Sequence, residues 1–297
     1  MSVMILLVGE QPAPNLLPLR HYDPSRVVLV HTSFPLSQLR GRRLAGLIGD
    51  AVEHPLCEVD AYRIEAIRQV LGAYLQERGW SGNELIFNLT GGTKTMSLAA
   101  YEVAREMSAS AFYYQSEDRQ SLIHHYRFDR GALIAEEPLA IAETLALDDY
   151  LKLYVGRYTP SDLPKQPFEA AVYQALKTSG VTGLEVMPAV FLTELGGNVE
   201  VDMLVRHGNQ VAVLEAKRKA GKEGIDQLNG VTDQRTLGTY TRKLLVSATP
   251  LDDNNLALAA AHRIDVVVLE SGRESALSAA DRAKLIDVIT GMLGVRQ

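Results

Sequence analysis

The chain has 297 residues, of which 46% are hydrophobic and 22% are charged, a composition that is typical of globular proteins and excludes the disordered and membrane-embedded classes. Its formal net charge of -6 provides no general attraction for nucleic acid, so any such contact would have to come from a local basic patch. The single cysteine, Cys57, excludes an intramolecular disulfide and a cysteine metal cluster, and it fits the reducing cytoplasm as the expected location.

The first half of the chain alternates short apolar runs with stretches of helical periodicity. Helices are clearest at Tyr62–Arg78 and Thr95–Met107. The runs Leu122–Phe128 and Ala132–Ala135 predict a hairpin at a sheet edge. This alternation predicts a mostly parallel, doubly wound α/β sheet. Its strands are expected at Val3–Val8, Arg26–His31, Leu56–Val59, Glu84–Asn88 and Ala111–Gln115.

No apolar stretch approaches the roughly 18 residues that a membrane-spanning helix needs. The N-terminal run MSVMILLVG lacks a basic flank and is too short for a signal peptide. We therefore expect a first buried strand there and no membrane partner.

A proline-rich stretch divides the chain. Tyr158–Pro167 holds three prolines and is the best candidate for a linker. We therefore expect a first domain at residues 1–155, a linker at 156–167 and a second domain at 168–297.

The second half follows a different order of elements. A helix is expected at Phe168–Lys177, followed by three strands in succession and then by a helix, a strand, a helix, a strand and a terminal helix. The segments after the first helix are Glu185–Thr193, Val199–Arg206, Gln210–Lys217, Gly224–Gln234, Arg242–Ser247 and Ile264–Leu269.

The sequence NLTGGTKTM, residues 88–96, joins a predicted strand to a predicted helix. Two adjacent glycines allow backbone N–H groups to approach an anion, and the start of a helix adds a favourable dipole. The spacing does not match a Walker loop. A phosphate-binding loop is one interpretation, and a capped helix after a tight turn is the other.

A second connection, Gly9–Pro24, is unusually long for a compact domain and leaves the same end of the predicted sheet. It can therefore reach the same crevice as the glycine loop. The alternative is a surface excursion held down by Leu16, Leu17 and Leu19.

The motifs VGEQPAPNLLP and NLTGGTKTM resemble the two ligand loops of CRISPR-associated Rossmann-fold (CARF) sensor domains. The resemblance implies a homodimer that binds a cyclic oligoadenylate, most often cyclic tetra-adenylate, across its twofold axis. It implies ligand phosphate or ribose contacts by Thr90, Gly91, Gly92, Thr93 and Lys94. It also implies that the earlier loop closes over the ligand through Glu10, Gln11, Pro12 and Asn15, with Ser33 facing the same crevice.

Two acids in the second half lie where a hairpin would bring them together. Strand alternation puts Glu200 and Asp202 on one face of VEVDMLV, and Glu215 and Lys217 on one face of QVAVLEAK. Buried carboxylates are costly without a partner, and a divalent cation would resolve that cost. The alternative is a cross-strand salt bridge in which Lys217 neutralises an acid on a solvated face.

The D…E-x-K pattern within this order of elements resembles the core of PD-(D/E)XK nucleases, although Val201 replaces the usual proline. The resemblance implies a restriction-endonuclease-like α/β domain that uses Mg²⁺ or Mn²⁺. The ion would be held by Asp202, Glu215 and the carbonyl of Ala216, with Glu169 completing the site. Lys217 would orient or deprotonate the attacking water, Gln227 would add a polar group, and Glu200 would support the acids.

Together the two resemblances imply a CARF domain fused to a nuclease, as in CRISPR ancillary nucleases. The implied function is metal-dependent cleavage of DNA or RNA, activated by cyclic tetra-adenylate in type III CRISPR defence. A nucleic-acid-binding regulator without cleavage and a ring nuclease that degrades the cyclic ligand remain as alternatives. The sequence does not choose between DNA and RNA as substrate.

Overall fold

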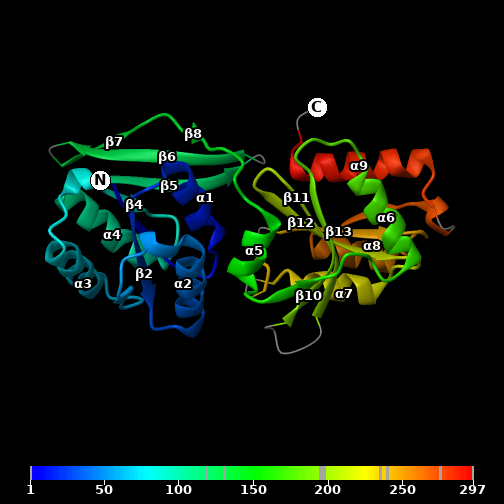
Figure 1. The fold of residues 1–297 in the computed structure, drawn as a ribbon, viewed down its shortest axis with the longest axis horizontal. Coiled ribbons are helices and arrows are strands. Elements are labelled where there is room, and N and C mark those ends of the chain that lie inside the picture. The colour runs from blue at the N-terminus through cyan, green and yellow to red at the C-terminus, as the bar shows by residue number, and fades with distance from the viewer. Residues whose placement is uncertain are drawn as a thin grey trace. The chain divides into compact units, whose positions relative to one another are not determined.

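A computed structural model describes residues 2–117, 120–129, 131–193, 199–233, 236–238, 241–273 and 276–295. The contacts divide the chain into two compact units, Met1–Thr144 and Leu145–Gln297. Each unit has its own sheet (Figure 1). Along the described ranges, no helix combines the length and the apolar character that crossing a membrane requires.

The sheet of the first unit has the strand order β3-β2-β1-β4-β5-β6-β7, and β8 pairs with β6. The strands from β3 to β5 pair in parallel, and the pairs from β5 to β7 are antiparallel. This arrangement confirms the predicted doubly wound sheet with a hairpin at its edge. The strands are β1 Val3–Leu7, β2 Arg26–Thr32, β3 Cys57–Val59, β4 Leu85–Asn88, β5 Ser110–Glu117, β6 Gln120–Asp129, β7 Ala132–Ala135 and β8 Leu139–Ala140.

Helices connect the parallel strands. The apolar sides of α3 and α4 pack on the face of the sheet that carries Ile5 and Leu7, where Ile67, Leu71 and Met96 are fully buried. The helices are α1 Ala13–Tyr22, α2 Pro35–Ile48, α3 Ile64–Glu77 and α4 Lys94–Glu106, with short 3-10 turns at Gly49–Ala51 and Gly82–Glu84.

The connection after β1 differs from its prediction as a long loop, because most of it forms α1. Prolines are tolerated in the first turn of a helix, where the N–H would have no intrahelical partner. Pro14 lies in that turn, and only Pro18 lies inside the helix. Leu16 and Leu17 are 2% exposed, so apolar burial stabilises this short helix against the sheet.

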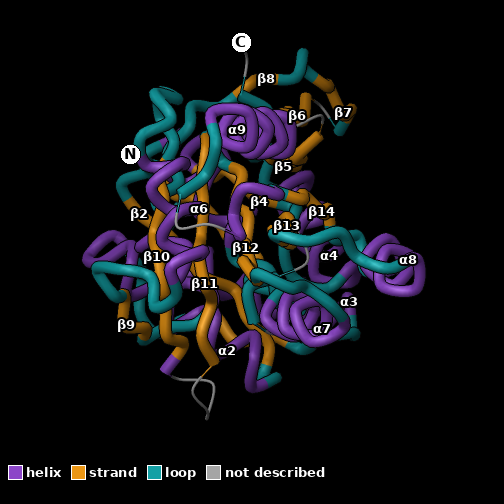
Figure 2. The backbone as a smooth tube through the Cα atoms, turned by 90° about the vertical axis from the view of Figure 1, so that its right-hand side faces the viewer, coloured by secondary structure: helices purple, strands orange, loops and turns teal. Residues whose placement is uncertain are grey.

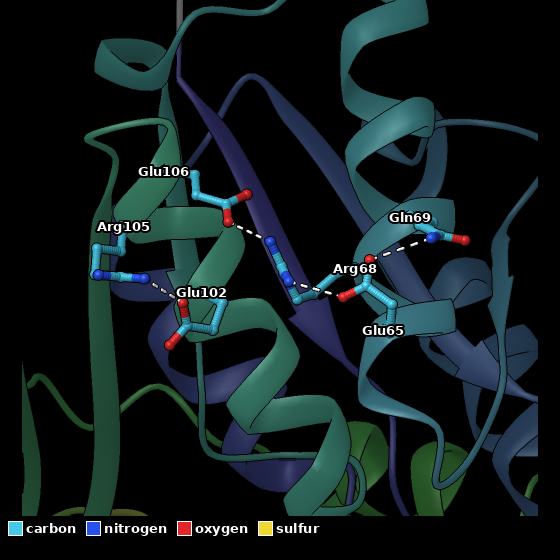
Figure 3. A network of polar contacts seen from close by, with 6 residues as sticks. All are labelled: Glu65, Arg68, Gln69, Glu102, Arg105 and Glu106. Carbon is cyan, nitrogen blue, oxygen red and sulfur yellow. Dashed lines mark hydrogen bonds and ion pairs between the residues drawn. The ribbon is translucent and has the colours of Figure 1, made fainter.

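The outer sides of α3 and α4 are joined by a polar network (Figure 3). Arg68 of α3 lies 2.8 Å from Glu65 on its own helix and also pairs with Glu106 of α4. Arg105 and Glu102 form a further pair along α4 at 2.5 Å. Exposed ion pairs contribute little free energy each, so the buried apolar contacts hold the two helices together.

The sheet of the second unit has the order β14-β13-β12-β11-β10-β9, and β10, β11 and β12 run side by side (Figure 2). The pairs from β9 to β12 are antiparallel, whereas β12, β13 and β14 pair in parallel. The strands are β9 Tyr158–Pro160, β10 Glu185–Leu192, β11 Val199–His207, β12 Gln210–Lys217, β13 Arg242–Ser247 and β14 Asp265–Val268.

One face of this sheet is covered by α6 and α9. Phe168 and Val172 of α6 and Leu285 and Ile289 of α9 are buried in one core with Leu214 of β12. The helices are α5 Leu147–Tyr154, α6 Pro167–Lys177, α7 Lys222–Val231, α8 Asp253–Ala261 and α9 Ala279–Leu293, with a 3-10 turn at Glu270–Arg273. The helix expected at Gly224–Gln234 corresponds to α7, and Gln234 lies outside the described residues.

The division between the units differs from the expected linker at 156–167. Within that segment Tyr158–Pro160 forms β9, which pairs with β10 at the edge of the second sheet. The preceding helix α5 also belongs to the second unit. The hydroxyl of Tyr150 on α5 bonds the carbonyl of Leu237 and lies 2.6 Å from the Thr241 hydroxyl. Proline content could not reveal these contacts, because they depend on partners far along the chain.

Replacing Tyr150 by Phe should lower the free energy of unfolding by about 1–2 kcal/mol, because a buried hydroxyl loses its partners. Urea denaturation of the full chain would measure this loss. Tyr113, which is 45% exposed on β5, provides the control, and Tyr113→Phe should leave stability unchanged. Equal stability of the Tyr150 variant and the wild type would contradict the assignment of α5 to the second core.

Candidate functional site

The loops that follow β1 and β4 border the switch point of the first sheet. From β1 the chain proceeds to β2 and β3 on one side, and β4 and β5 lie on the other side. In open parallel sheets, ligands bind outside the carboxyl ends of the strands at such a point. Both loops singled out in the sequence therefore lie at one edge of the sheet.

The two loops touch through glycines. A Cβ on Gly9 would lie 3.0 Å from the backbone nitrogen of Gly92, and a Cβ on Gly91 would lie 1.9 Å from the carbonyl oxygen of Leu7. Gly92 also has a φ of 71°, which side chains other than glycine rarely adopt. The paired glycines are thus required by the close approach of the backbones.

A pair of asparagines, Asn15 and Asn88, also links the two loops. The Asn15 side chain donates to the Leu7 carbonyl at 2.9 Å and accepts from the Asn88 amide at 3.0 Å. Asn88 also donates to the carbonyl of Pro14 at 2.9 Å. That carbonyl has no helical donor, because the residue four positions later is Pro18, which has no N–H. Asn15 was expected to contact ligand, but it is fully buried and both ends of its amide are engaged. In this structure it positions the loops.

The hydroxyl of Thr90 holds the loop to the neighbouring strand. It accepts the Tyr114 N–H of β5 at 2.7 Å, and the Thr90 N–H donates to Asn88 at 3.0 Å. Sequence reasoning missed Asn88. The available signal was a polar side chain at the last position of an otherwise apolar strand.

Thr93 is the N-cap of α4, and its hydroxyl accepts the Met96 N–H at 3.2 Å. The same hydroxyl donates to the carbonyl of Ala61 in the loop after β3, at 2.7 Å. Lys94 follows as the first residue of the helix and is exposed. Lys94 is also the single lysine among residues 1–144, which makes it a distinctive cation at this edge.

The remaining residues expected at this edge differ in exposure. Glu10 and Ser33 are exposed, Gln11 is half-buried and Pro12 is buried. Ser33 directly follows β2. The Ser37 hydroxyl of α2 accepts the N–H of Thr32, the last residue of β2, at 3.1 Å and donates to the Val8 carbonyl just after β1 at 2.9 Å, so it ties the ends of the two strands together.

In the second unit, the hairpin of β11 and β12 brings two acids together. Met203 pairs with Leu214, and continuing this register places Asp202 opposite Glu215. Both side chains are buried, with 6% and 1% of their residue surfaces exposed. The register therefore brings the two acids together as predicted. The ion pair that the alternative predicted, between Lys217 and an acid, is also present, but the two acids are buried and not on a solvated face.

Lys217 lies between the acids. Its Nζ is 2.5 Å from Glu215 Oε1 and 3.8 Å from Asp202 Oδ2. Asp202 Oδ2 also accepts the Ala216 N–H at 2.9 Å. Lys217 thus forms a close ion pair with the buried Glu215 carboxylate and lies farther from that of Asp202.

Burial controls the acid–base properties of the pair. Burial, followed by the charge of Asp202, raises the pKa of Glu215 to about 8. Burial also raises the pKa of Asp202, although the Ala216 N–H and Lys217 oppose the rise. Burial by itself would lower the pKa of Lys217, but the contact with Glu215 raises it. The arrangement therefore disfavours two bare carboxylates and favours an added cation.

Glu169 approaches the acids from the start of α6. It is 6% exposed, and its carboxylate accepts the Gln166 N–H at 3.1 Å in a capping box. Burial, followed by the charge of Asp202, raises its pKa. Glu169 therefore caps the start of α6 and also lies close enough to Asp202 to feel its charge.

The side chain of Gln227 contacts the backbone of Glu200. The Gln227 side chain donates to the Glu200 carbonyl at 3.3 Å, and the Glu200 carboxylate pairs with Lys165 at 2.5 Å. Helix α7 comes close to the acids at Gly224, where a Cβ would lie 3.8 Å from the Cγ atoms of Glu215 and Lys217. Gln227 thus anchors α7 to β11 beside the site.

Strand β10 is distorted beside Asp202. Ala189, which the register places opposite Asp202, has a φ of 42°, and its carbonyl accepts the Ser161 N–H at 3.0 Å. A left-handed alanine costs about 1–2 kcal/mol, and such strain is concentrated at functional sites. Nothing in the sequence marks an alanine for this conformation.

The donor set fits a hard divalent cation, because carboxylate and carbonyl oxygens are the ligands that Mg²⁺ and Mn²⁺ prefer. Two buried carboxylates share the single ammonium of Lys217, and the raised pKa values of both acids also favour an added cation. Within the described residues, no three histidine, cysteine, aspartate or glutamate side chains form a ready-made metal cluster. Any ion would therefore depend on the two acids, the carbonyl of Ala216 and water.

Residues 3–150 match the family described as the Card1 CARF domain. The first half of the chain is therefore a CARF domain, and the resemblance inferred from its two loop motifs is confirmed. No curated protein has a sequence that matches this chain significantly.

Solved structures share the fold of both units. Can2 from Sulfobacillus thermosulfidooxidans, solved in complex with cyclic tetra-adenylate, has a TM-score of 0.75 over 99% of both chains at 16% identity. Protein VC1899 from Vibrio cholerae has a TM-score of 0.72 over 98% of both chains at 13% identity. A type III CRISPR defence DNA nuclease activated by cyclic oligoadenylate has a TM-score of 0.59 at 20% identity, over 83% of this chain and 45% of that one. The protein thus has a CARF domain followed by a second α/β domain, and these structures share the fold of both.

Gly91→Ala should lower the free energy of unfolding by about 2 kcal/mol or more, because the new methyl group would overlap the Leu7 carbonyl. Gly72 in α3 has open space around it, so Gly72→Ala is the matched control. It should be neutral or stabilise the protein by up to about 1 kcal/mol. Thermal and urea denaturation of both variants would measure the difference, and similar effects would contradict the tight loop contact.

Glu215→Gln should remove part of the pH dependence of stability. Between the ordinary value of 4.5 and about 8, the folded state keeps a proton that the unfolded state has released. The stability of the wild type therefore falls as the pH rises across this window and levels off above about 8, and the loss from this group is at most about 5 kcal/mol. The variant should show a shallower slope in urea titrations with chelator present.

Asp287→Asn, an exposed position on α9, is the control for this titration and should keep the wild-type slope. Identical slopes for the wild type and Glu215→Gln would show that Glu215 titrates normally in the folded protein.

Proposed function

We propose that the protein is a metal-dependent endonuclease of DNA or RNA that cyclic tetra-adenylate activates allosterically in type III CRISPR antiviral defence. The observation that carries the proposal is the combination, in one chain, of a CARF domain with two buried acids opposite each other beside Lys217. Two solved proteins that share the fold support it: one was solved in complex with cyclic tetra-adenylate, and the other is a DNA nuclease activated by cyclic oligoadenylate.

The sensor half would bind the cyclic ligand at the edge formed by the loops after β1 and β4. Backbone N–H groups at Gly91 and Gly92 and the exposed ammonium of Lys94 would receive the phosphates. Thr90 and Thr93 keep the loop in place through hydrogen bonds that already exist. Glu10, Gln11 and Ser33 would line the ligand from neighbouring loops. A second copy of the chain would complete the site across a twofold axis.

The nuclease half would hold Mg²⁺ or Mn²⁺ with Asp202, Glu215 and the carbonyl of Ala216, and Glu169 would act directly or through water. The ion would supply activation of the attacking water and neutralisation of charge on the phosphate. Lys217 would orient that water and offset the charge that develops on the phosphate. The water oxygen bonds to phosphorus while a P–O bond breaks and its oxygen leaves with a proton. Arg218 and Lys219, which are exposed after β12, would attract the nucleic-acid backbone.

Activation would be allosteric only if the ligand binds two states of the dimer with different affinities. The nuclease should therefore need the ligand, the metal ion and the two acids together. Full-rate cleavage without the ligand would exclude the switch.

Asp202→Asn and Glu215→Gln should each reduce cleavage by about a thousandfold or more, because each removes a charged oxygen ligand. The assay uses labelled single- and double-stranded DNA and RNA with Mn²⁺, with and without cyclic tetra-adenylate. Asp287→Asn should retain wild-type activity. Ligand binding without cleavage of any substrate would instead favour a regulator, and chromatographic loss of the ligand in the Asp202 variant would reveal a ring nuclease.

Lys94→Ala should weaken binding of cyclic tetra-adenylate by about tenfold or more, since a charge-assisted contact is lost. Calorimetry would measure the affinity. In the wild type, the ligand should also protect Lys94 from an amine-reactive label, whereas Lys219 should be labelled equally with and without it. Unchanged affinity together with unchanged labelling would exclude Lys94 from the ligand site.

A further inference from the structure

Two exposed aromatic side chains meet beside the glycine loop. Phe34 is 47% exposed and Tyr62 is 67% exposed. Their ring centroids lie 6.1 Å apart at an interplanar angle of 64°, which is an edge-to-face contact. Adjoining exposed apolar side chains differ from the singly scattered ones that are normal on a protein surface.

Both rings lie at the carboxyl edge where the candidate ligand loops lie. Phe34 comes two residues after β2, next to Ser33, and Tyr62 lies between β3 and α3. The residue before Tyr62 is Ala61, whose carbonyl accepts from the hydroxyls of Thr93 and Thr95, both at 2.7 Å. The aromatic pair is therefore tied directly to the start of α4, where the loop ends.

The backbone under both rings is fixed. The Asp60 carboxylate accepts the N–H groups of Tyr62 and Arg63 at 2.7 and 2.8 Å, and these bonds lower the pKa of Asp60. On the other side, the Phe34 N–H donates to the Thr32 hydroxyl at 3.4 Å. Hydrogen bonds thus fix the backbone that carries the rings, while the rings themselves are exposed to solvent.

The chemistry of the pair complements that of the loop. Backbone N–H groups and Lys94 suit phosphates, but they offer nothing to the apolar faces of bases. Aromatic side chains stack on bases, and each stacked base contributes substantially to affinity. Two rings and the neighbouring Ile64, which is 37% exposed, form too small a surface for a subunit interface of about 800 Å² per partner.

We propose that Phe34 and Tyr62 form a stacking platform for the adenine bases of the cyclic oligoadenylate. This inference rests on the proposed function and adds base recognition to it. The phosphates would be received at Gly91–Lys94, and a base would lie against the aromatic pair at the adjoining end of the same edge.

The test is the affinity of Phe34→Ala and Tyr62→Ala for cyclic tetra-adenylate, and the fluorescence of an analogue that carries one 2-aminopurine. Each variant should bind about tenfold or more weakly, and the quenching of 2-aminopurine should diminish. Phe34→Tyr and Tyr62→Phe should bind like the wild type, since both keep an aromatic face. Leu133→Ala, at a side chain on β7 that is also 47% exposed, is the control.

A cyclic tetra-uridylate separates bases from backbone, because it has the same phosphates but bases that stack more weakly. The wild type should prefer the adenylate ring, and the alanine variants should lose most of that preference. Equal affinities for wild type and both variants would overturn the platform while leaving the sensor intact. Failure of the wild type to bind cyclic tetra-adenylate would overturn the proposed function as well. A dimeric wild type with monomeric variants in sedimentation would identify a subunit contact and reject the platform.

Discussion

The burial of two carboxylates opposite each other is the constraint on which the second unit depends. Asp202 and Glu215 face one another across β11 and β12 because the hairpin register leaves no other arrangement. A one-residue slip of either strand would turn its acid to the opposite face of the sheet and bring an apolar residue to the site. The buried pair is surrounded closely. Lys217 forms an ion pair with Glu215, the charge of Asp202 helps to raise the pKa of Glu169, and α7 approaches the acids at Gly224.

The first unit depends on a different constraint, the close contact of two loops at the end of its sheet. Gly91 and Gly92 remove side chains where the backbones meet, and Asn15 and Asn88 satisfy the polar groups that this contact buries. The carboxyl edge of this sheet therefore carries backbone N–H donors and Lys94 at the glycine loop. The exposed rings of Phe34 and Tyr62 lie beside that loop.

Much of this could be predicted from local patterns. Strand alternation identified Asp202 and Glu215, and the structure shows that a two-residue turn at Gly208 and Asn209 fixes their pairing. The parallel strands of the first unit followed from their apolar runs. Helix α1 could not be predicted, because its prolines suggested a loop while buried leucines decided the outcome. Strand β9, the left-handed Ala189 and the buried role of Asn15 depend on distant partners, which local sequence does not reveal.

The asparagine pair has a consequence for how the edge captures a ligand. The Leu7 and Pro14 carbonyls and the Thr90 N–H all bond the same two amides, so opening either loop would strand several buried polar groups at once. The loops therefore form a single preorganised body. A ligand that binds there loses little free energy to ordering the chain, and more of its contact energy remains for shifting the equilibrium between protein states.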